Sequence, residues 1–454
     1  MLLLLMERLW DIKKLHKLFQ RRHYGVFFLI FFINQGEFIL PNFIILIKYY
    51  KFKGGIIMYD DFPILHNKNI IYFDNAATTL KPERVIQAMN DYLNYYTSNI
   101  HRGLYSNAIV TDYLYDSTRE VVKEFIHCNS PKEVVFTSGT THSINLMVFG
   151  YMKYHLHAGD EVLLSKAEHA SNVLPWLRLA EEIGIVVRYI PLSDDYSLNY
   201  EDVVLSITEK TKVISLAHVT NVIGDVRDIE KIGKICFSKG ILFHVDGAQS
   251  VPHMKVDFQA AHIDFLSFSG HKMCGPTGVG VLVAREDLLK EMVPVFYGGG
   301  MNHSFDSTGK YQLVGYPSLF EAGTPPILEV LGLKSAIEYL MEIKMDKIQQ
   351  YESELKKYLL SELETVPDVV LYNRDSSSGI LVFNIRGVSS ADVSKYLNSF
   401  HICVRAGSHC SKMLKENMDI SSTVRVSLYF YNTKEEIDYF ISVLQRCRNV
   451  FHVV

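Results

Sequence analysis

From residue 82 onward, short apolar runs alternate with amphipathic stretches of helical length. A first helix is predicted from Pro82, since proline is tolerated in the first helical turn, to about Tyr96. A second amphipathic stretch covers Asp112–His127. The strand-like runs, each of which we expect to be followed by a helix, are Glu133–Phe136, Glu161–Ser165, Ile185–Ile190, Lys212–Ala217 and Ile241–Val245. This alternation predicts an α/β fold in which helices cover both faces of a mostly parallel sheet.

The pattern changes after Pro325-Pro326, which we interpret as a domain boundary. Two long helices are predicted beyond it, at Ile327–Glu342 and Lys347–Leu363. The elements predicted after these helices are strands near Gly379–Ile385, Ile402–Arg405 and Thr423–Tyr429 and a last helix from Thr433. The sequence therefore predicts an N-terminal arm and large domain over residues 58–325 and a smaller α+β domain over residues 326–454.

Residues 1–57 differ in character from the rest. Basic residues are followed by two apolar runs, 26–33 and 43–47, which fall short of the roughly 18–20 residues that a membrane-spanning helix needs. A transit peptide and a membrane anchor both stay open as interpretations. A third is that the segment is not translated, because the codons for residues 53–57 permit a purine-rich ribosome-binding sequence ahead of Met58. We take Met58 as the initiator, which the intact mass of the natively expressed protein would test.

Composition is that of an ordinary globular enzyme, with 454 residues, 48% apolar and 21% charged. The net charge of −4 and the lack of a long basic block argue against a nucleic-acid partner. The six cysteines show no CxxC spacing, so neither a zinc knuckle nor a disulfide framework is indicated and no metal is expected. This cysteine usage fits a reducing compartment, and we expect a cytoplasmic protein rather than one attached to a membrane.

Lys272 and Asp246 stand at the ends of two short apolar runs. Such a lysine can form a Schiff base with an aldehyde, and such an aspartate can hold a pyridinium nitrogen; together they indicate a pyridoxal-phosphate (PLP) site. An ordinary strand-end carboxylate and a solvated loop lysine are the plainer alternatives. However, Gly270 before the lysine and the run 275–278 after it form a tight, backbone-rich loop, in which a free lysine would gain little.

Ser138, Gly139, Thr140 and Thr141 precede a predicted helix, where hydroxyls and backbone N–H groups can bind a phosphate. A simple helix cap is the alternative. His169 follows a predicted strand end and could stack on an aromatic cofactor, although a loop histidine is the usual interpretation.

Cys410 is the residue that distinguishes between the reactions a PLP site could catalyse. Small and polar neighbours surround it, with His409 adjacent and Arg405 five positions earlier, whereas a buried inert cysteine would have apolar neighbours. Electropositive loops of this kind lower the pKa of a thiol and expose a nucleophile. Arg405 and Arg425 lie on separate predicted strands, and either could bind a substrate carboxylate; a surface salt bridge is the alternative.

Nine motifs occur together and in order: Asp74–Thr79, Asn99–Gly103, Gly139–Thr141, Glu168–His169, His218–Gly224, Val245–Gln249, Ser269–Lys272, Glu321–Pro325 and Arg405–Cys410. In these residues the chain resembles the class V, fold-type I PLP-dependent transferases, and specifically the SUF-type (group II) cysteine desulfurases. The resemblance covers about residues 59–450. The short spacing of 15 positions from Cys410 to Arg425 is similar to that of group II.

The resemblance implies a homodimer that converts L-cysteine to L-alanine and supplies sulfur for iron–sulfur cluster assembly. Lys272 would hold the cofactor and transfer the proton, His169 would stack on the ring, and Cys410 would accept the sulfur. The other implied cofactor contacts are Asp246 to the ring nitrogen, Gln249 to the ring hydroxyl, Asn221 beside the ring, Thr140, Thr141, Ser269 and His271 to the phosphate, and Thr324 from the other subunit. The implied substrate contacts are Arg425, Arg405, Asn221 and His101.

Two residues depart from the family pattern. Ser408-His409 stands where many group II members have two histidines, which we expect to be tolerated because Ser408 does not supply the thiol. Ala391 stands where members served by a zinc-containing acceptor carry a histidine, so a SufE-like or SufBCD-type recipient is expected. Selenocysteine lyase or cysteine-sulfinate desulfinase is the nearest alternative activity, and a non-catalytic scaffold is an alternative from another class.

Overall fold

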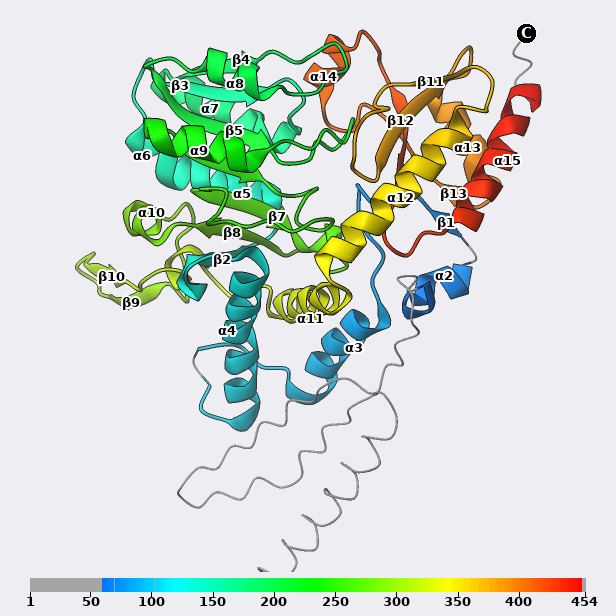
Figure 1. Ribbon diagram of the computed structural model, residues 1–454. Coiled ribbons are helices and arrows are strands. Elements are labelled where there is room, and N and C mark those ends of the chain that lie inside the picture. The colour runs from blue at the N-terminus through cyan, green and yellow to red at the C-terminus, as the bar shows by residue number, and fades with distance from the viewer. Residues whose placement is uncertain (1–58, 69, 102, 451–454) are drawn as a thin grey trace, which may run out of the picture. The chain divides into compact units, whose positions relative to one another are not determined.

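The computed structural model describes residues 59–68, 70–101 and 103–450. Its larger sheet has seven strands in the order β2-β8-β7-β6-β5-β3-β4 (Figure 1). These strands are β2 (Val134–Thr137), β3 (Glu161–Ser165), β4 (Val186–Ile190), β5 (Thr211–Ala217), β6 (Leu242–Asp246), β7 (Phe265–Ser269) and β8 (Gly280–Ala284). The five strands from β7 to β4 are parallel, whereas β8 runs antiparallel to both β7 and β2. The predicted mostly parallel sheet is confirmed.

Helices cover both faces of this sheet because its strands are apolar on both sides. Leu163 on β3 joins a core that includes the helices α4 (Ser106–Ile126), α9 (Ile229–Lys239) and α11 (Ile327–Ile343). Its neighbour Leu164 joins a second core with the helices α5 (Thr140–Met147), α7 (Leu174–Ile183) and α10 (Glu286–Glu291). The alternation of side chains along each strand thus divides the core into two layers.

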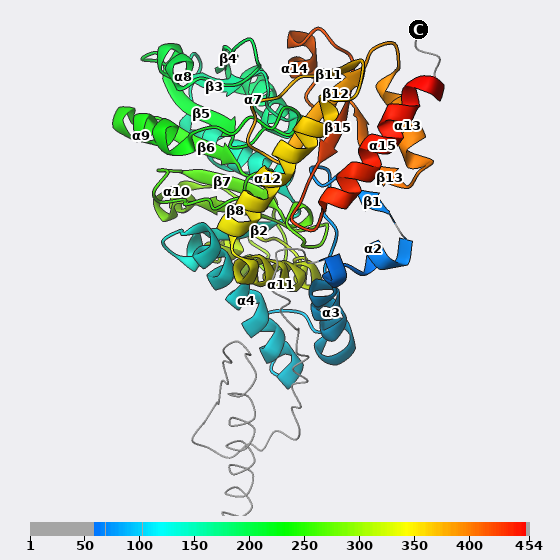
Figure 2. The ribbon, with the colours of Figure 1, turned by 45° about the vertical axis from the view of Figure 1, so that its right-hand side comes forward.

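The smaller sheet has four antiparallel strands in the order β11-β12-β15-β14, and Figure 2 labels β11, β12 and β15. They are β11 (Val369–Leu371), β12 (Ile380–Ile385), β14 (Arg405–Gly407) and β15 (Thr423–Ser427). The helices that pack on this sheet are α12 (Met345–Leu363), α13 (Ser390–Asn398) and α15 (Lys434–Val450), and they share one apolar core with it. α11, which precedes them, packs in the core of the larger sheet instead.

Shorter elements connect these layers. The helical ones are η1 (Tyr59–Asp61), α2 (Pro63–Lys68), α3 (Glu83–Asp91), η2 (Tyr92–Tyr96), η3 (Pro131–Glu133), η4 (Val148–Met152), α6 (Lys153–His155), η5 (Ala170–Asn172), α8 (Tyr200–Ser206), η6 (Gly270–Lys272), η7 (Ser318–Phe320) and α14 (Lys412–Asn417). The extended ones are β1 (Ile71–Tyr72), β9 (Asn302–Phe305), β10 (Tyr311–Leu313) and β13 (Ile402–Cys403).

One predicted element is wrong. A helix was expected after the apolar run 241–245, but residues 247–264 form turns before β7 begins. This segment is held by contacts with distant elements: Tyr429 donates to the carbonyl of Pro252 at 2.9 Å, and His253 pairs with Glu352 at 2.8 Å. These tertiary contacts outweigh the local helical pattern. The helix predicted from Asp112 also begins earlier, at Ser106.

The segment 71–79 runs between the two sheets and is bonded to both. Ile71 pairs in parallel with Ile402, and the backbone N–H of Ala76 donates to Ser427 Oγ at 2.9 Å. Further along, the Thr79 backbone N–H donates to the carbonyl of His271, beside Lys272, at 3.0 Å. This arm therefore fixes the end of β7 relative to β15.

The interpretation of residues 1–57, with Met58 as initiator, lies outside the described residues and stays a prediction. The domain boundary at residues 325–326 also stays a prediction. Among the described helices, none combines the length and apolar character that a membrane crossing requires.

A buried ion pair joins α4 to the segment before α11. Both terminal nitrogens of the Arg119 guanidinium donate to Glu321, at 2.9 and 2.7 Å. Glu321 also accepts from the Phe136 backbone N–H at 2.7 Å and from the Tyr115 hydroxyl at 3.0 Å. The two side chains are only 6% and 5% exposed, so each charge relies on the other for compensation.

We expect Arg119→Met to lower the free energy of unfolding by about 3–5 kcal/mol, because it leaves the Glu321 carboxylate buried without its cation. Urea denaturation of the purified protein measures this loss. Arg178→Ala is the matched control, since Arg178 pairs with Glu181 at 3.1 Å while 60% exposed, and it should change stability far less. Equal losses in the two variants would contradict the role of burial.

Candidate active site

A cavity of about 240 Å³ opens where the parallel strands β5 and β6 end, beside the loop that carries Cys410. The carboxyl edge of a parallel sheet is the usual place for a ligand in this type of fold. The lining residues are Ala76, Ala77, Thr140, Thr141, His169, Ser171, Ala217, Val219, Asn221, Asp246, Ala248, Gln249, Ser269, His271, Lys272, Arg405, His409, Cys410 and Arg425.

All but two of the site residues expected from the sequence line this cavity. The two exceptions are His101 and Thr324. His101 is exposed and donates its backbone N–H to Asp112 at 2.6 Å, and exposed Thr324 accepts from Asn99 at 3.4 Å. These two residues therefore belong to one region of the surface, around residues 99–101 and 321–324.

Burial sets the charge states of Lys272 and Asp246. It lowers the pKa of the Lys272 amine to about 8, while the nearby Asp246 carboxylate acts in the opposite direction. Burial raises the pKa of Asp246 to about 6, against the effect of the Ala248 N–H, which donates to it at 3.0 Å. With this pKa, Lys272 is still largely protonated at neutral pH but carries a much larger fraction of nucleophilic neutral amine than an ordinary lysine.

The carbonyl of His271, immediately before Lys272, accepts four hydrogen bonds. They come from Thr78 Oγ1 at 3.0 Å, Thr79 Oγ1 at 3.1 Å, the Thr79 N–H at 3.0 Å and Lys81 Nζ at 3.0 Å. Thr79 Oγ1 in turn accepts from the Cys274 N–H at 2.8 Å. This cluster of donors fixes the backbone from which the Lys272 side chain extends.

The N-terminus of α5 presents hydroxyls to the cavity. The Thr140 N–H donates to Ser269 Oγ at 2.8 Å, and the two hydroxyls are 2.6 Å apart. Thr141 Oγ1 lies 2.7 Å from Ser171 Oγ. Hydroxyl groups at a helix N-terminus suit an anion such as a phosphate.

His169 is held as a neutral ring. Its Nδ1 accepts from the Ser171 backbone N–H at 3.1 Å, which places the ring proton on Nε2. Burial, followed by the charge of Lys272, lowers the pKa of His169 to about 4. A neutral imidazole in the cavity wall can pack against a flat ligand without adding charge.

Two arginines face each other across the ladder of the smaller sheet, Arg405 on β14 and Arg425 on β15. Like charges placed directly opposite repel. Asp74 offsets this repulsion, because its carboxylate lies 3.1 Å from Arg425 and 3.8 Å from Arg405. Arg425 is buried, and its second terminal nitrogen donates to the carbonyl of Asn221 at 2.7 Å.

Cys410 has the one exposed thiol among the six cysteines, all of which lie in the described part of the chain. The preceding His409 is buried, and its Nε2 lies 3.0 Å from Thr423 Oγ1. His409 and Cys410 both adopt left-handed backbone angles, with φ of 55° and 58°. Residues other than glycine rarely hold this conformation without support from their surroundings.

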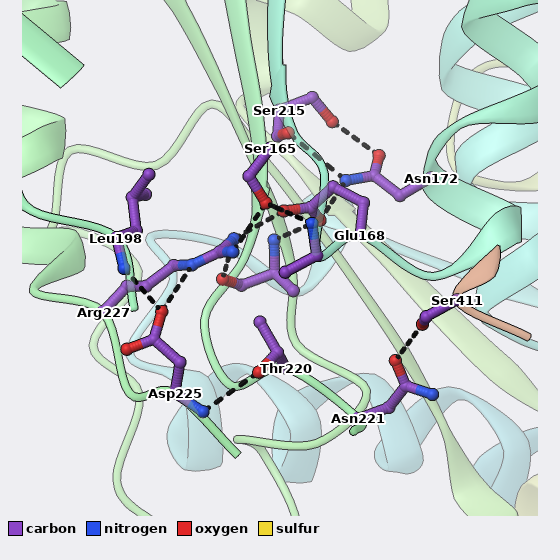
Figure 3. A network of polar contacts seen from close by, with 12 residues as sticks. Ser165, Glu168, Asn172, Leu198, Ser215, Thr220, Asn221, Asp225, Arg227 and Ser411 are labelled. Atoms are coloured by element: carbon purple, nitrogen blue, oxygen red, sulfur yellow. Dashed lines mark hydrogen bonds and ion pairs between the residues drawn. The ribbon is translucent and has the colours of Figure 1, made fainter. Parts of the chain in front are cut away.

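A buried ion pair lies in a network that connects the end of β5 to the turn carrying His169 (Figure 3). Glu168 accepts from Arg227 at 2.5 Å, and both side chains are almost fully buried. The other Glu168 oxygen accepts from the Ala217 N–H at 2.7 Å and from Asn172 at 2.9 Å. The end of β5 and the turn that carries His169 are thus fixed to each other.

Three buried polar atoms of cavity-lining residues have no hydrogen-bond partner within the described chain: Gln249 Oε1, Arg425 Nε and His409 Nδ1. Buried polar groups are normally paired, so these three atoms are available to a bound ligand or an ordered water. The site as a whole offers a reactive amine, a buried carboxylate, an anion-binding helix end, a guanidinium and a thiol.

The sequence did not assign a role to Asp74, Lys81 or Ser411. Asp74 was noted as part of a motif, but its contact with two arginines joins residues 351 positions apart. Lys81 is half-buried near the lysine loop, and desolvation lowers its pKa to about 8. Ser411 donates to Asn221 at 2.9 Å. A local pattern carries no signal for such contacts.

Comparison with known proteins identifies relatives of this chain. The model of the family described as aminotransferase class-V matches residues 71–440. A protein named "Probable cysteine desulfurase" from Halalkalibacterium halodurans is 40% identical over 397 residues, covering 86% of this chain and 97% of its own. The cysteine desulfurase of Thermococcus onnurineus superposes with a TM-score of 0.82 at 35% identity, covering 85% of this chain and 96% of its own. The structure of a cysteine desulfurase of Escherichia coli superposes with a TM-score of 0.81 at 33% identity, covering 86% of this chain and 98% of its own.

We expect iodoacetamide to alkylate Cys410 first in the native protein. Burial raises the pKa of Cys128, Cys236 and Cys274 to about 12 and that of Cys447 to about 11, so these thiols carry little thiolate near neutral pH. Peptide mass mapping against time measures the order of labelling. The fast phase should disappear in Cys410→Ser, and equally fast labelling of half-buried Cys403 would contradict the expectation.

Proposed function

Because the chain belongs to the aminotransferase class-V family, we propose that it is a PLP-dependent cysteine desulfurase. It converts L-cysteine to L-alanine and leaves the sulfur on Cys410 as a persulfide. The observation that carries this proposal is that the exposed Cys410 lines the same cavity as Lys272, Asp246 and Arg425. The names of the relatives from H. halodurans and T. onnurineus support it.

The residues of the cavity fit PLP. Lys272 would hold the cofactor aldehyde, Asp246 the ring nitrogen, and the unpaired Gln249 Oε1 the ring hydroxyl. His169 would pack on the ring with Asn221 beside it. The residues that would hold the phosphate are Thr140, Thr141, Ser269 and His271. When bound, PLP supplies an electron sink for the carbon next to the substrate nitrogen.

The chain's own groups then position the substrate and move its proton. Arg425 Nε, buried and unpaired, would bind the substrate carboxylate, with Arg405 beside it. The Lys272 amine would take the proton from the substrate Cα, since burial keeps its pKa low enough for the neutral form to be populated. His169, neutral and fixed by Ser171, would keep the ring face free of further charge.

Sulfur transfer needs no external oxidant. The Cys410 thiolate attacks the substrate sulfur and forms an S–S bond, while the Cβ–S bond breaks and its electron pair stays with the substrate carbon. That carbon gains a proton and becomes the methyl group of alanine. The transferred sulfur is oxidised and the carbon reduced by the same two electrons, which leaves a persulfide on Cys410.

We further propose the subtype, sulfur recipient, location and oligomeric state of the protein. The chain would be a group II member that feeds iron–sulfur cluster assembly in the cytoplasm through a SufE-like or SufBCD-type recipient, consistent with Ala391 at its position on α13 and with six free thiols. It would act as a homodimer. Support for this comes from His101 and Thr324, which lie outside this chain's cavity and share one surface region, as residues serving a second copy would.

We expect Cys410→Ala to reduce alanine and sulfide formation from L-cysteine by at least about 100-fold, because the variant lacks the sulfur acceptor. Coupled assays of the two products with the purified holoenzyme measure this. The variant should keep its cofactor absorbance, since Cys410 holds no part of PLP. An undiminished rate would instead favour selenocysteine lyase or cysteine-sulfinate desulfination, which depend less on the thiol.

We also expect covalent capture of PLP by the apoprotein to become faster as pH rises through about 8, since burial lowers the pKa of Lys272 to about 8 and only its neutral amine attacks the aldehyde. The rate should level off above that pH, where the amine is fully deprotonated. Borohydride fixation followed by mass measurement counts the captured cofactor. Lys272→Ala should capture none, and a rate that stays flat from about pH 6 to about pH 10 would contradict the assignment.

A further inference from the structure

The two residues that flank Cys410 are both hydrogen-bonded to one side chain, the amide of Asn221. Its Nδ2 donates to the carbonyl of His409 at 2.7 Å, and its Oδ1 accepts from Ser411 Oγ at 2.9 Å. Figure 3 shows the second of these bonds beside the buried ion-pair network. Asn221, His409 and Ser411 are buried, whereas the residue between the last two, Cys410, is exposed.

Further contacts fix the same backbone from other directions. The Ala170 N–H, next to His169, donates to the carbonyl of Cys410 at 3.0 Å. On the opposite side, the ring of His409 is bonded to Thr423 on β15. The residues around the thiol are therefore held by loops at the end of the larger sheet and by β15 of the smaller sheet, while the Cys410 side chain stays exposed.

Asn221 also contacts the proposed carboxylate-binding arginine. Its backbone carbonyl accepts from Arg425 at 2.7 Å. The loop that carries Asn221 is itself fixed at its far end, where Arg227 donates to the carbonyl of Ala217 at 3.1 Å and to Glu168. Asn221, on a fixed loop, is therefore hydrogen-bonded both to the residues that flank the thiol and to Arg425.

Ser411 has no other evident structural task. It stands at the N-cap of α14, where a serine normally caps the helix through its hydroxyl. Here the side chain makes no capping hydrogen bond and donates to Asn221 instead. Helix capping therefore does not explain the orientation of this hydroxyl.

We propose that Ser411 is a positioning residue for sulfur transfer. Through its hydrogen bond to Asn221 it holds Cys410 in the left-handed conformation, which keeps the thiol in the cavity at a fixed position relative to Arg425. The inference rests on the proposed function. Ser411 does not itself line the cavity, and its contact with the site is the hydrogen bond to Asn221. Its removal should slow the sulfur step and spare the proton chemistry of Lys272.

The test compares two reactions of the holoenzyme in Ser411→Ala. Exchange of the Cα proton of L-alanine in D2O, followed by NMR, reports Lys272 and the cofactor without any sulfur chemistry. Alanine formation from L-cysteine requires the thiol. We expect exchange to stay within about twofold of wild type, while kcat for desulfuration falls by about 10- to 100-fold because the thiol is misplaced. Alkylation of Cys410 should also become faster as the loop loosens.

Two further variants sharpen the comparison. Ser411→Thr keeps a hydroxyl and should restore most of the desulfuration rate. Ser408→Ala is the matched control, since Ser408 is exposed on the other side of Cys410 and the atom it contributes to the loop is its carbonyl, which accepts from the Ser411 N–H. It should desulfurate at the wild-type rate.

Desulfuration by Ser411→Ala within about twofold of wild type would overturn the inference. So would a parallel fall in exchange and desulfuration, because Ser411 would then act on the cofactor pocket and not on the thiol. Failure of the proposed function has a different signature: the unmodified protein would neither exchange alanine nor form it from L-cysteine, and the inference would fall with it.

Discussion

The arm at residues 71–79 is the constraint on which the rest of the site depends. Its first residues pair with the segment at 402–403, its middle is bonded to Ser427, and its end donates to the carbonyl of His271. The larger sheet supplies the amine and the smaller sheet supplies the arginines and the thiol loop. Because the arm is hydrogen-bonded to both, it fixes the distance between groups that must meet at one substrate.

The cavity carries an excess of positive charge. Among the described residues that line it, Lys272, Arg405 and Arg425 are basic and Asp246 is acidic, and Asp74 lies beside the two arginines. Burial lowers the pKa of Lys272 and of Arg425, which reflects the free-energy cost of keeping these cations away from water. An anionic phosphate and a substrate carboxylate would relieve that cost, so binding and charge compensation favour the same ligands.

Much of the fold and of the site composition could be predicted from sequence. The strand at Glu161–Ser165 and the helix starting at Ile327 match their predictions because strong apolar periodicity is a local signal. The class V family assignment is confirmed. The segment after β6 was predicted wrongly, since its turns are held by Tyr429 and Glu352, which lie far away in the chain.

The sequence by itself determined which chemical groups the protein has: a lysine and an aspartate at strand ends, and a cysteine in a polar loop. The tertiary structure decided how they act together. It placed Asp74 between Arg405 and Arg425, bonded Asn221 to both neighbours of the thiol, and left His101 and Thr324 outside the cavity. The physical reason is range: residue type and spacing encode local propensity, whereas hydrogen bonds between residues 190 or 351 positions apart exist only once both sheets have packed.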